Sequence, residues 1–325
     1  YSIEEKILAS VFLLSNSPDP LVTSLKPDWS PYFSEDVEVR MCLFVPTFNW
    51  SALFPYELNL SSNIELNDWL RSQLIQPDVF IRLRPGKEKI VKEQIGKLKL
   101  PAHPISPTCI SFPAAVNLDL LPGLNRDYVI QDYSSQQIDQ LLQLVPTNAI
   151  SSCWDCCAAS GGKSLLLHAL EPSVYILASD NRASSLLNLE VRFKQAGITQ
   201  FRRREIDLLA EINSIEKDSM DGIILDAPCS GSGTWSRTPE MLSQFNESQI
   251  EKFIYLQRTI AENAVQFLKP GCPLVYITCS VFKEENEEAV AYFLANLPLK
   301  LEKMELIKGY ESKADTMFVA RFLKH

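Results

Sequence analysis

Short apolar runs and longer helical stripes alternate regularly along the second half of this chain. Apolar residues spaced three and four apart predict helices at 164–170, 183–195, 248–268 and 284–297. The runs before them predict buried strands at Ala149–Asp155, Val174–Asp180, Gly222–Asp226 and Pro273–Thr278. This alternation is typical of a mainly parallel sheet with crossover helices. We therefore expect an α/β fold with a doubly wound, Rossmann-like sheet, closed by an antiparallel pair at 301–307 and 317–323.

The first 120 residues lack this regular order. Apolar positions between Ile3 and Leu14 fit one face of a helix. An apolar run at 78–84, a Pro-Gly turn and a helical stripe at 87–95 predict a smaller α+β unit, and four prolines at 101–113 indicate an irregular crossing after it. We predict three parts: a helical or irregular extension at 1–75, a small α+β region at 76–120 and the Rossmann-like domain at 121–325.

The composition and the cysteine content restrict which classes of protein this chain can belong to. The 325 residues are 46% hydrophobic and 22% charged, as in ordinary globular proteins, and we expect no membrane segment because every apolar run is short. Eight cysteines include one C-x-x-C pair, Cys153 and Cys156, and there are only three histidines. We therefore expect a cytoplasmic monomer with free thiols and no bound metal.

The net charge of −9 argues against a protein that coats nucleic acid with its whole surface. Positive charge is nevertheless concentrated in two places, each of which fits either a local nucleic-acid contact or a solvated face. The two clusters comprise Arg82, Arg84, Lys87, Lys89 and Lys92, and Arg202, Arg203 and Arg204.

Two cysteines follow two of the predicted strands, where open α/β sheets carry their chemistry. Cys229 lies in the segment Asp226-Ala-Pro-Cys-Ser-Gly-Ser-Gly-Thr234, and Cys279 lies in Tyr276-Ile-Thr-Cys-Ser280. A thiolate is the soft nucleophile needed to attack an electron-poor ring carbon. The other cysteines, Cys42, Cys109, Cys153, Cys156 and Cys272, are interpreted as small apolar residues.

The segment from Asp155 to Ser164, rich in small residues, links the first strand to its helix and allows a ligand to approach the backbone. Asp180 ends the next strand, where a carboxylate can accept both hydroxyls of a ribose. Asp207 follows the third strand and would reach the adenine end of the same cofactor. Helix capping is the alternative role for Asp155 and Asp207.

A different enzyme class shares part of this pattern. Gly162-Lys163-Ser164 matches the end of the phosphate-binding loop G-x-x-x-x-G-K-[ST] of NTPases. The first glycine of that loop is replaced by Cys157, and without it the loop cannot easily fold its amides around a phosphate. A P-loop NTPase is therefore the weaker alternative.

The quoted segments, with Glu285-Asn-Glu287 and the lead-in Gln131-Asp-Tyr-Ser-Ser135, resemble the motifs of the Sun/Fmu (RsmB-like) family of RNA (cytosine-5) methyltransferases. Their order and spacing agree over residues 75–325, and residues 78–95 look like the family's small RNA-binding domain. Ser160 replaces a usual proline and Thr316-Met317-Phe318 replaces Gly-Phe-Phe. Neither change removes a reacting group.

The resemblance implies an S-adenosylmethionine-dependent RNA (cytosine-5) methyltransferase acting on RNA, ribosomal RNA in particular. It implies that Cys279 is the nucleophile and that Cys229 assists release of the methylated base. Lys163 is the candidate cation for ionising Cys279, and Asp226 would hydrogen-bond the cytosine. The cofactor would be held by Cys157, Ala158, Ala159, Ser160, Gly161, Gly162, Lys163, Asp180, Asp207 and Asp226.

A third class stays open, a non-catalytic RNA-binding assembly factor on the same fold, which would not need both thiols and Asp226. Arg237 and Pro239 would hold an RNA phosphate or shape their loop, while Asn286 and Glu287 would brace the site or cap a helix. A target base must leave its stack to reach a thiol in a pocket, so an RNA loop or opened helix is the expected substrate.

Overall fold

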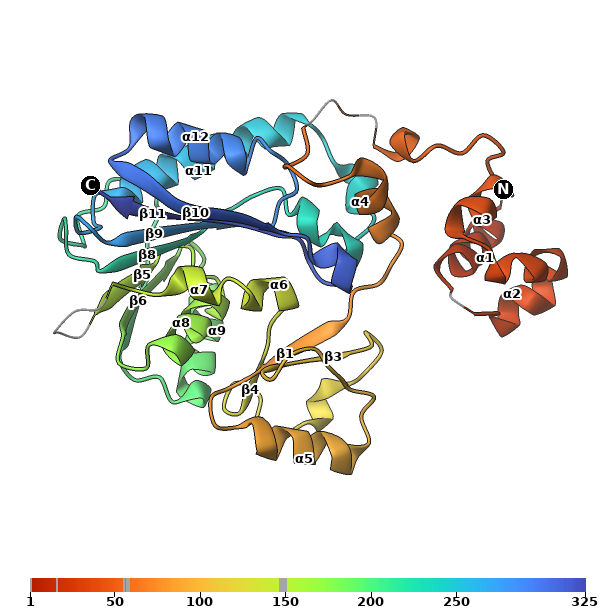
Figure 1. The fold of residues 1–325 in the computed structure, drawn as a ribbon, viewed down its shortest axis with the longest axis horizontal. Helices are drawn as coiled ribbons and strands as arrows, with labels where there is room; N and C mark the ends of the chain where they lie inside the picture. Colours follow the sequence, from red (N-terminus) through yellow and green to blue (C-terminus); the bar gives the residue numbers. More distant parts are fainter. Residues whose placement is uncertain (1, 16, 55, 57–58, 146–150) are drawn as a thin grey trace.

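The computed structural model describes residues 2–15, 17–54, 56, 59–145 and 151–325. Figure 1 shows a large sheet with helices on both sides, a smaller sheet packed below it, and a group of N-terminal helices to one side. Within the described residues, no helix is both long and apolar enough to cross a bilayer.

The large sheet has seven strands in the order β10-β11-β9-β8-β5-β6-β7. β7, β6, β5, β8 and β9 are mutually parallel, whereas β11 runs antiparallel to both β9 and β10. The strands are β5 (Ser152–Asp155), β6 (Tyr175–Asp180), β7 (Phe201–Glu205), β8 (Gly222–Asp226), β9 (Pro273–Thr278), β10 (Leu299–Ile307) and β11 (Met317–Lys324). The predicted doubly wound fold and its closing antiparallel pair are confirmed. Residues 149–150 of the first predicted strand lie outside the described residues.

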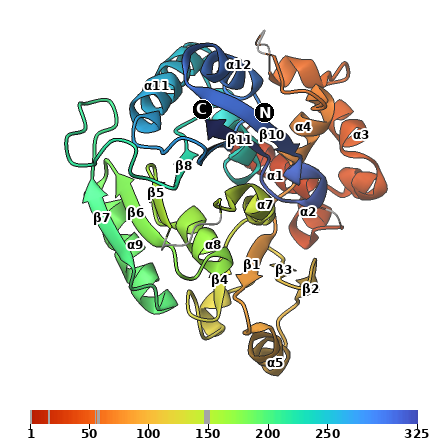
Figure 2. The same cartoon turned by 60° about the vertical axis from the view of Figure 1, so that its left-hand side comes forward.

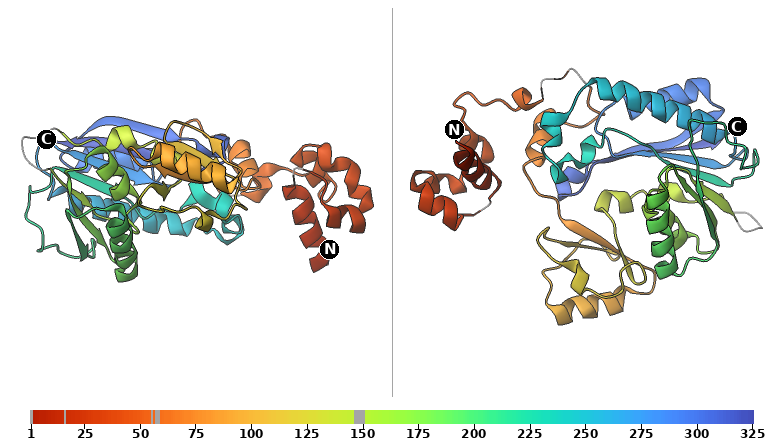
Figure 3. Two further views of the ribbon diagram at one scale, coloured as in Figure 1. Left: turned by 90° about the horizontal axis from the view of Figure 1, so that it is seen from below. Right: turned by 180° about the vertical axis from the view of Figure 1, so that it is seen from behind.

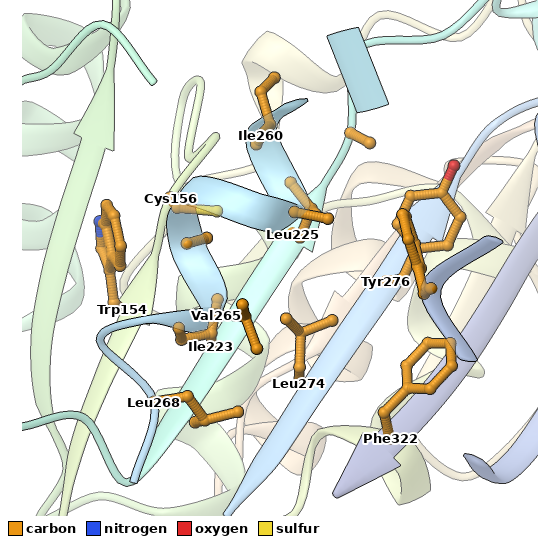
Figure 4. Packing of buried hydrophobic residues seen from close by; sticks show 14 of the residues in the cluster. Trp154, Cys156, Ile223, Leu225, Ile260, Val265, Leu268, Leu274, Tyr276 and Phe322 are labelled. Atoms are coloured by element: carbon orange, nitrogen blue, oxygen red, sulfur yellow. The ribbon is translucent and has the colours of Figure 1, made fainter. Parts of the chain in front are cut away.

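Helices cover both faces of this sheet (Figures 1 and 2). One face packs on α11 (Ser248–Val265) and α12 (Glu287–Asn296), and the other on α7 (Asp139–Leu142), α8 (Gly162–Leu170) and α9 (Ala183–Ala196). Figure 4 shows Val265 of α11 beside Ile223 and Leu274 of the strands, and Ile260 of α11 nearer Leu225. Burial of these apolar faces holds the strand ends, and thus the site, in place.

A smaller antiparallel sheet has the order β2-β3-β1-β4 and carries α5 (Glu88–Leu98). Its strands are β1 (Val79–Leu83), β2 (His103–Pro104), β3 (Cys109–Phe112) and β4 (Tyr128–Ile130). The sheet therefore continues past residue 120, where the sequence suggested a boundary, because β4 pairs with β1. The division of the chain into three parts stays a prediction.

Two separate cores involve the N-terminal part. One joins α1 (Ile3–Leu14), α2 (Pro20–Leu25) and the 3₁₀ segment Pro27–Ser34 around Phe12. Arg40 of α3 (Val37–Cys42) donates to the Phe12 carbonyl, and Figure 3 shows these helices standing away from the sheets. The other packs α4 (Leu66–Ser72) against the large domain. The remaining short helices are α6 (Tyr133–Gln136), α10 (Met241–Gln244) and five 3₁₀ segments at Pro27–Ser34, Trp50–Leu53, Leu118–Leu120, Ser232–Arg237 and Gly309–Ser312.

Candidate active site

Two thiols meet at the carboxyl ends of β8 and β9. Cys279 directly follows β9 and Cys229 lies three residues beyond the end of β8, and their sulfur atoms are 3.4 Å apart. Both side chains are partly exposed. The parallel pairing of β8 with β9 brings together two residues that lie fifty positions apart in the sequence.

The loop after Cys229 is fitted tightly around Cys279. The backbone N–H of Gly233 donates to the Cys279 carbonyl over 2.9 Å, and the N–H of Thr316 donates to the Gly233 carbonyl over 2.8 Å. A Cβ atom at position 233 would lie 2.1 Å from the Thr316 carbonyl oxygen. Glycine is therefore required here by close backbone approach, and it joins the loops of both thiols to the start of β11.

Lys163, in the first turn of α8, lies near the carboxyl ends of β8 and β9. Its Nζ lies 3.0 Å from Asp226 Oδ2, and the lysine is buried. Burial would by itself lower the pKa of the Lys163 ammonium, but the Asp226 carboxylate and the nearby Cys279 and Asp155 more than offset this, so the pKa is raised. Lys163 is thus a fixed cation beside Asp226, and its positive charge favours negative charge on Asp226 and Cys279.

The two thiols have different surroundings. The pKa of Cys229 is raised well above its usual range by the hydrogen bond with Cys279, by burial and by the nearby charges of Cys279 and Glu285. Cys229 is therefore held protonated at neutral pH, and Cys279 is the member of the pair that lies close enough to Lys163 to interact with its charge. The environment distinguishes two chemically identical side chains.

A cavity of about 470 Å³ opens beside the thiols. It is lined by five of the residues expected to hold a cofactor, namely Cys157, Ala159, Asp180, Asp207 and Asp226, and by both Cys229 and Cys279. Ala158, Ser160, Gly161, Gly162 and Lys163 do not line it. These five residues belong to the turn between β5 and α8 and to the start of α8, and the same turn carries Cys157 and Ala159, which do line the cavity.

This turn is fixed by hydrogen bonds at several points. The Ala159 N–H donates to Asp180 Oδ2 over 3.0 Å, with Ala159 in a left-handed conformation (φ 44°). Arg192 Nη1 donates to the carbonyl and hydroxyl oxygens of Ser160, each over 2.8 Å. Asp180 also accepts hydrogen bonds from the backbone and guanidinium of Arg182. Its carboxylate is therefore placed at the cavity but already has protein partners.

Asp207 and Asp155 hydrogen-bond neighbouring parts of the chain but cap no helix of the described structure, since α8 begins after Gly161 with no side-chain cap. Asp207 lies at the cavity but caps the following turn, accepting the Leu209 N–H over 2.9 Å. Asp155 is fully buried and accepts the Ser164 hydroxyl over 2.6 Å, while its Oδ1 has no hydrogen-bond partner in the described structure. Burial raises the pKa of Asp155 to about 7.

Of the basic residues singled out in the sequence, Arg82 differs from its interpretation as a surface charge. Arg82 is buried, with Nε donating to Gln131 Oε1 over 2.7 Å, because its side chain points inward from β1. It cannot contact RNA phosphates directly, whereas Lys87, Lys89 and Lys92 are exposed. Arg237 pairs with Asp132 and Asp315 over 3.0 and 2.7 Å and so shapes its loop.

Residues 285–287 form hydrogen bonds with the segments next to the two thiols. Asn286 contacts Thr278, the Ser280 carbonyl and Ser61, and Glu287 accepts from the Ser61 hydroxyl. Ser61 was not anticipated from the sequence, because its partners lie over two hundred positions away. Glu285 was quoted there only as part of a motif, and its contacts with Ser230 and Ser280 depend on the tertiary fold.

The strand order and the thiol pair define the class of protein. Numbering β5 as strand 1, the order is 3-2-1-4-5-7-6 with an antiparallel seventh strand, the sheet of S-adenosylmethionine-dependent methyltransferases. Among the described residues no group of His, Cys, Asp or Glu has the arrangement of a metal site. Residues 140–325 match the family described as 16S rRNA methyltransferase RsmB/F. The chain belongs to this family.

Individual relatives agree with this assignment. Ribosomal RNA small subunit methyltransferase B of Klebsiella pneumoniae (strain 342) is 30% identical over 197 residues, which cover 60% of this chain and 45% of that protein. The protein of the same name from Shewanella oneidensis is 37% identical over 233 residues, covering 70% and 50%. The chain thus spans about half the length of the curated relatives it matches.

Solved structures share the fold. NSun6 from Pyrococcus horikoshii superposes with a TM-score of 0.71 at 19% identity, covering 85% of this chain and 99% of that chain. A methyltransferase homolog protein from the same organism gives a TM-score of 0.67 at 19% identity, covering 87% and 97%. At this identity the likeness concerns the fold.

Proposed function

We propose that this chain is an S-adenosylmethionine-dependent RNA (cytosine-5) methyltransferase. The observation that carries the proposal is the thiol pair, with sulfurs 3.4 Å apart, at the mouth of a cavity that Asp226 also lines. Carbon 5 of cytosine is too weak a nucleophile to accept a methyl group until a bond at carbon 6 raises the electron density of the ring. A thiol pair beside a carboxylate suits this chemistry.

The cavity suits the cofactor. Its volume of about 470 Å³ falls in the range of small-molecule sites. Asp180 stands at the tip of β6, where a ribose is held in doubly wound folds, and Ile206, Leu208 and Leu209 offer apolar surface for an adenine ring. S-adenosylmethionine supplies a methyl group on a positively charged sulfur.

The residues then act in a fixed order. The Cys279 sulfur would bond to carbon 6 while ring nitrogen 3 takes up a proton from water, and Asp226 would accept hydrogen bonds from the exocyclic amino group and the protonated nitrogen 3. Carbon 5 takes the methyl group and then loses its proton, with Cys229 taking part directly or through water. The electrons of that C–H bond restore the ring double bond and expel the Cys279 thiolate.

The proposed substrate is ribosomal RNA of the small subunit, as the family description and the names of the relatives suggest. The exposed lysines of α5 and its preceding turn, Lys87, Lys89 and Lys92, would contact RNA phosphates. A cytoplasmic monomer is part of the proposal, and the free thiols of all eight cysteines suit a reducing compartment. Light scattering of the purified chain measures its mass in solution.

Methyl transfer to RNA by purified protein tests the proposal. Cys279→Ala should abolish transfer, whereas Cys229→Ala should accumulate an RNA–protein complex that survives a denaturing gel, because the adduct forms but does not resolve. Cys272→Ala, at a buried thiol away from the site, is the control and should retain activity. Normal transfer by Cys279→Ala would contradict the proposal, and RNA binding without any transfer by the unmutated chain would favour the assembly-factor alternative. Family membership leaves no support for the P-loop NTPase.

A further inference from the structure

One buried carboxylate joins the loops of both thiols. Ser230 and Ser280 each follow a cysteine of the pair, and both hydroxyls donate to Glu285 Oε2 over 2.5 Å. The Ser230 N–H donates to Oε1 over 2.9 Å, and Gln257 Nε2 donates to the same oxygen over 3.0 Å. The carboxylate therefore fixes the residue next to Cys229 and the residue next to Cys279 at once.

These contacts suit an ionised carboxylate. Glu285 is fully buried and receives four hydrogen bonds, two on each oxygen. An ionised carboxylate can accept all four hydrogen bonds, whereas a protonated Oε2 would oblige one serine hydroxyl to turn and accept instead. Burial raises the pKa of Glu285, and the serine and glutamine donors oppose that rise. When ionised, Glu285 is a buried negative charge that these four hydrogen bonds compensate.

We propose that Glu285 is a positioning residue for both thiols, whose carboxylate fixes the two loops so that the sulfurs remain in contact. The inference rests on the proposed function, since it assigns Glu285 to the same reaction. The neighbouring backbone supports a built arrangement, because Gln257 also donates to the Pro228 carbonyl and Tyr276 donates to the Glu285 carbonyl. The two thiol loops, β9 and α11 are thereby joined at Glu285.

The charge of Glu285 has a second consequence for the reaction. It adds to the hydrogen bond and the burial that raise the pKa of Cys229. A Cys229 thiol that stays protonated cannot compete with Cys279 for carbon 6, since the thiolate is the nucleophile. Glu285 therefore helps to assign the two roles as well as the two positions.

Two substitutions separate the effect of the length of the Glu285 side chain from the effect of its charge. Glu285→Asp keeps the charge but is one methylene shorter and cannot span both serines, whereas Glu285→Gln keeps the length but loses the charge. Glu284→Gln is the matched control, because Glu284 is the adjacent carboxylate and accepts its hydrogen bonds from Asn59, away from the two serines. All three variants are compared by thermal unfolding, so that a folding defect is recognised.

The first readout is catalytic. We expect both Glu285 variants to resolve the RNA adduct about 10–100-fold more slowly and to accumulate the covalent complex, with KM for RNA nearly unchanged, because misplacement of a reacting group affects the chemical step. The acid limb of the pH profile should also move in Glu285→Gln but not in Glu284→Gln. A merely structural role would change the yield of folded protein without these effects.

The second readout needs no RNA. Diamide oxidises two neighbouring thiols to a disulfide and takes up their two hydrogens, and peptide mass spectrometry follows the Cys229–Cys279 bond. The unmutated chain and Glu284→Gln should cross-link at one rate, and the Glu285 variants about tenfold more slowly. Unchanged cross-linking in both Glu285 variants would overturn the inference. Slower cross-linking in a chain that methylates no RNA would instead support the positioning role and contradict the proposed function.

Discussion

At the scale of single residues, burial decides how the acidic side chains behave. Asp226 lies beside Lys163 and lines the cavity, whereas Asp155 is enclosed and has only the Ser164 hydroxyl as a side-chain partner. Asp155 and Asp226, which end the adjacent strands β5 and β8, therefore have different roles. One is placed to meet a substrate, and the other connects β5 to the first turn of α8.

Asp155→Asn should make the protein more stable at alkaline pH. The pKa of Asp155 in the folded chain is about 7, above its ordinary value of 3.8, so the stability it contributes is present at low pH and is lost as the pH rises through about 7. The variant should gain about 1–3 kcal/mol over the unmutated chain at pH 8 but not at pH 5. Thermal unfolding across this range measures the difference.

Asp119→Asn is the control for this prediction, because Asp119 has an exposed side chain. Its stability should follow the pH curve of the unmutated chain. If Asp155→Asn followed that curve as well, Asp155 would be ionised in the folded protein throughout this range.

At the scale of elements, backbone contacts set the distance between the two thiol loops. The 3₁₀ turn Ser232–Arg237 lies against the Cys279 carbonyl and the start of β11 only because position 233 has no side chain. The neighbouring atoms are carbonyl oxygens, which cannot rotate away as a flexible side chain would. The loop can therefore shift only if β9 or β11 shifts with it.

Gly233→Ala should separate the two thiols. The added Cβ would lie 2.1 Å from the Thr316 oxygen and 3.0 Å from the Cys279 oxygen. We expect a loss of about 1–3 kcal/mol of stability and a fall of about 100-fold in methyl transfer. Gly96→Ala, in α5 with no atom near its Cβ position, should retain activity. Equal activity of the two variants would show that the loop can move freely.

At the scale of the whole molecule, the chain before the small sheet supports the active-site loops. Trp69 of α4 is buried and donates its indole N–H to the Ser232 carbonyl over 3.3 Å. It packs edge-on against Phe54 and Phe282, and Phe282 lies three residues after Cys279. This part of the N-terminal segment therefore shares a core with the catalytic domain, while α1 and α2 have a core of their own.

Trp69→Ala should destabilise the protein by about 3–5 kcal/mol through the cavity it leaves. The backbone amides of residues 278–282 should then exchange with solvent faster, because their aromatic support is lost. Hydrogen exchange by mass spectrometry measures both effects. Trp29→Ala alters the separate N-terminal core and should leave exchange at 278–282 unchanged, and the same exchange in both variants would contradict the role given to α4.

The sequence alone determined the order of elements in the large domain and the residues that end its strands. Apolar runs predicted β8 and β9 at their observed bounds, because strands buried on both faces leave few polar positions. The helices α11 and α12 were predicted a few residues too long. At α12 this is because Glu285 and Asn286 contact the thiol loops before the helix begins. The sequence also placed Cys229 and Cys279 at strand ends, because each cysteine follows closely after a strand that its apolar run predicts.

Tertiary structure alone decided what surrounds those cysteines. The contact of Glu285 with Ser230, the contact of Ser61 with Asn286 and the contact of Arg82 with Gln131 join residues far apart in sequence. Local periodicity shows which residues are buried but does not show which partners meet inside. Burial, charge compensation and the close approach of Gly233 are properties of three-dimensional packing, and they determine how two identical thiols come to differ.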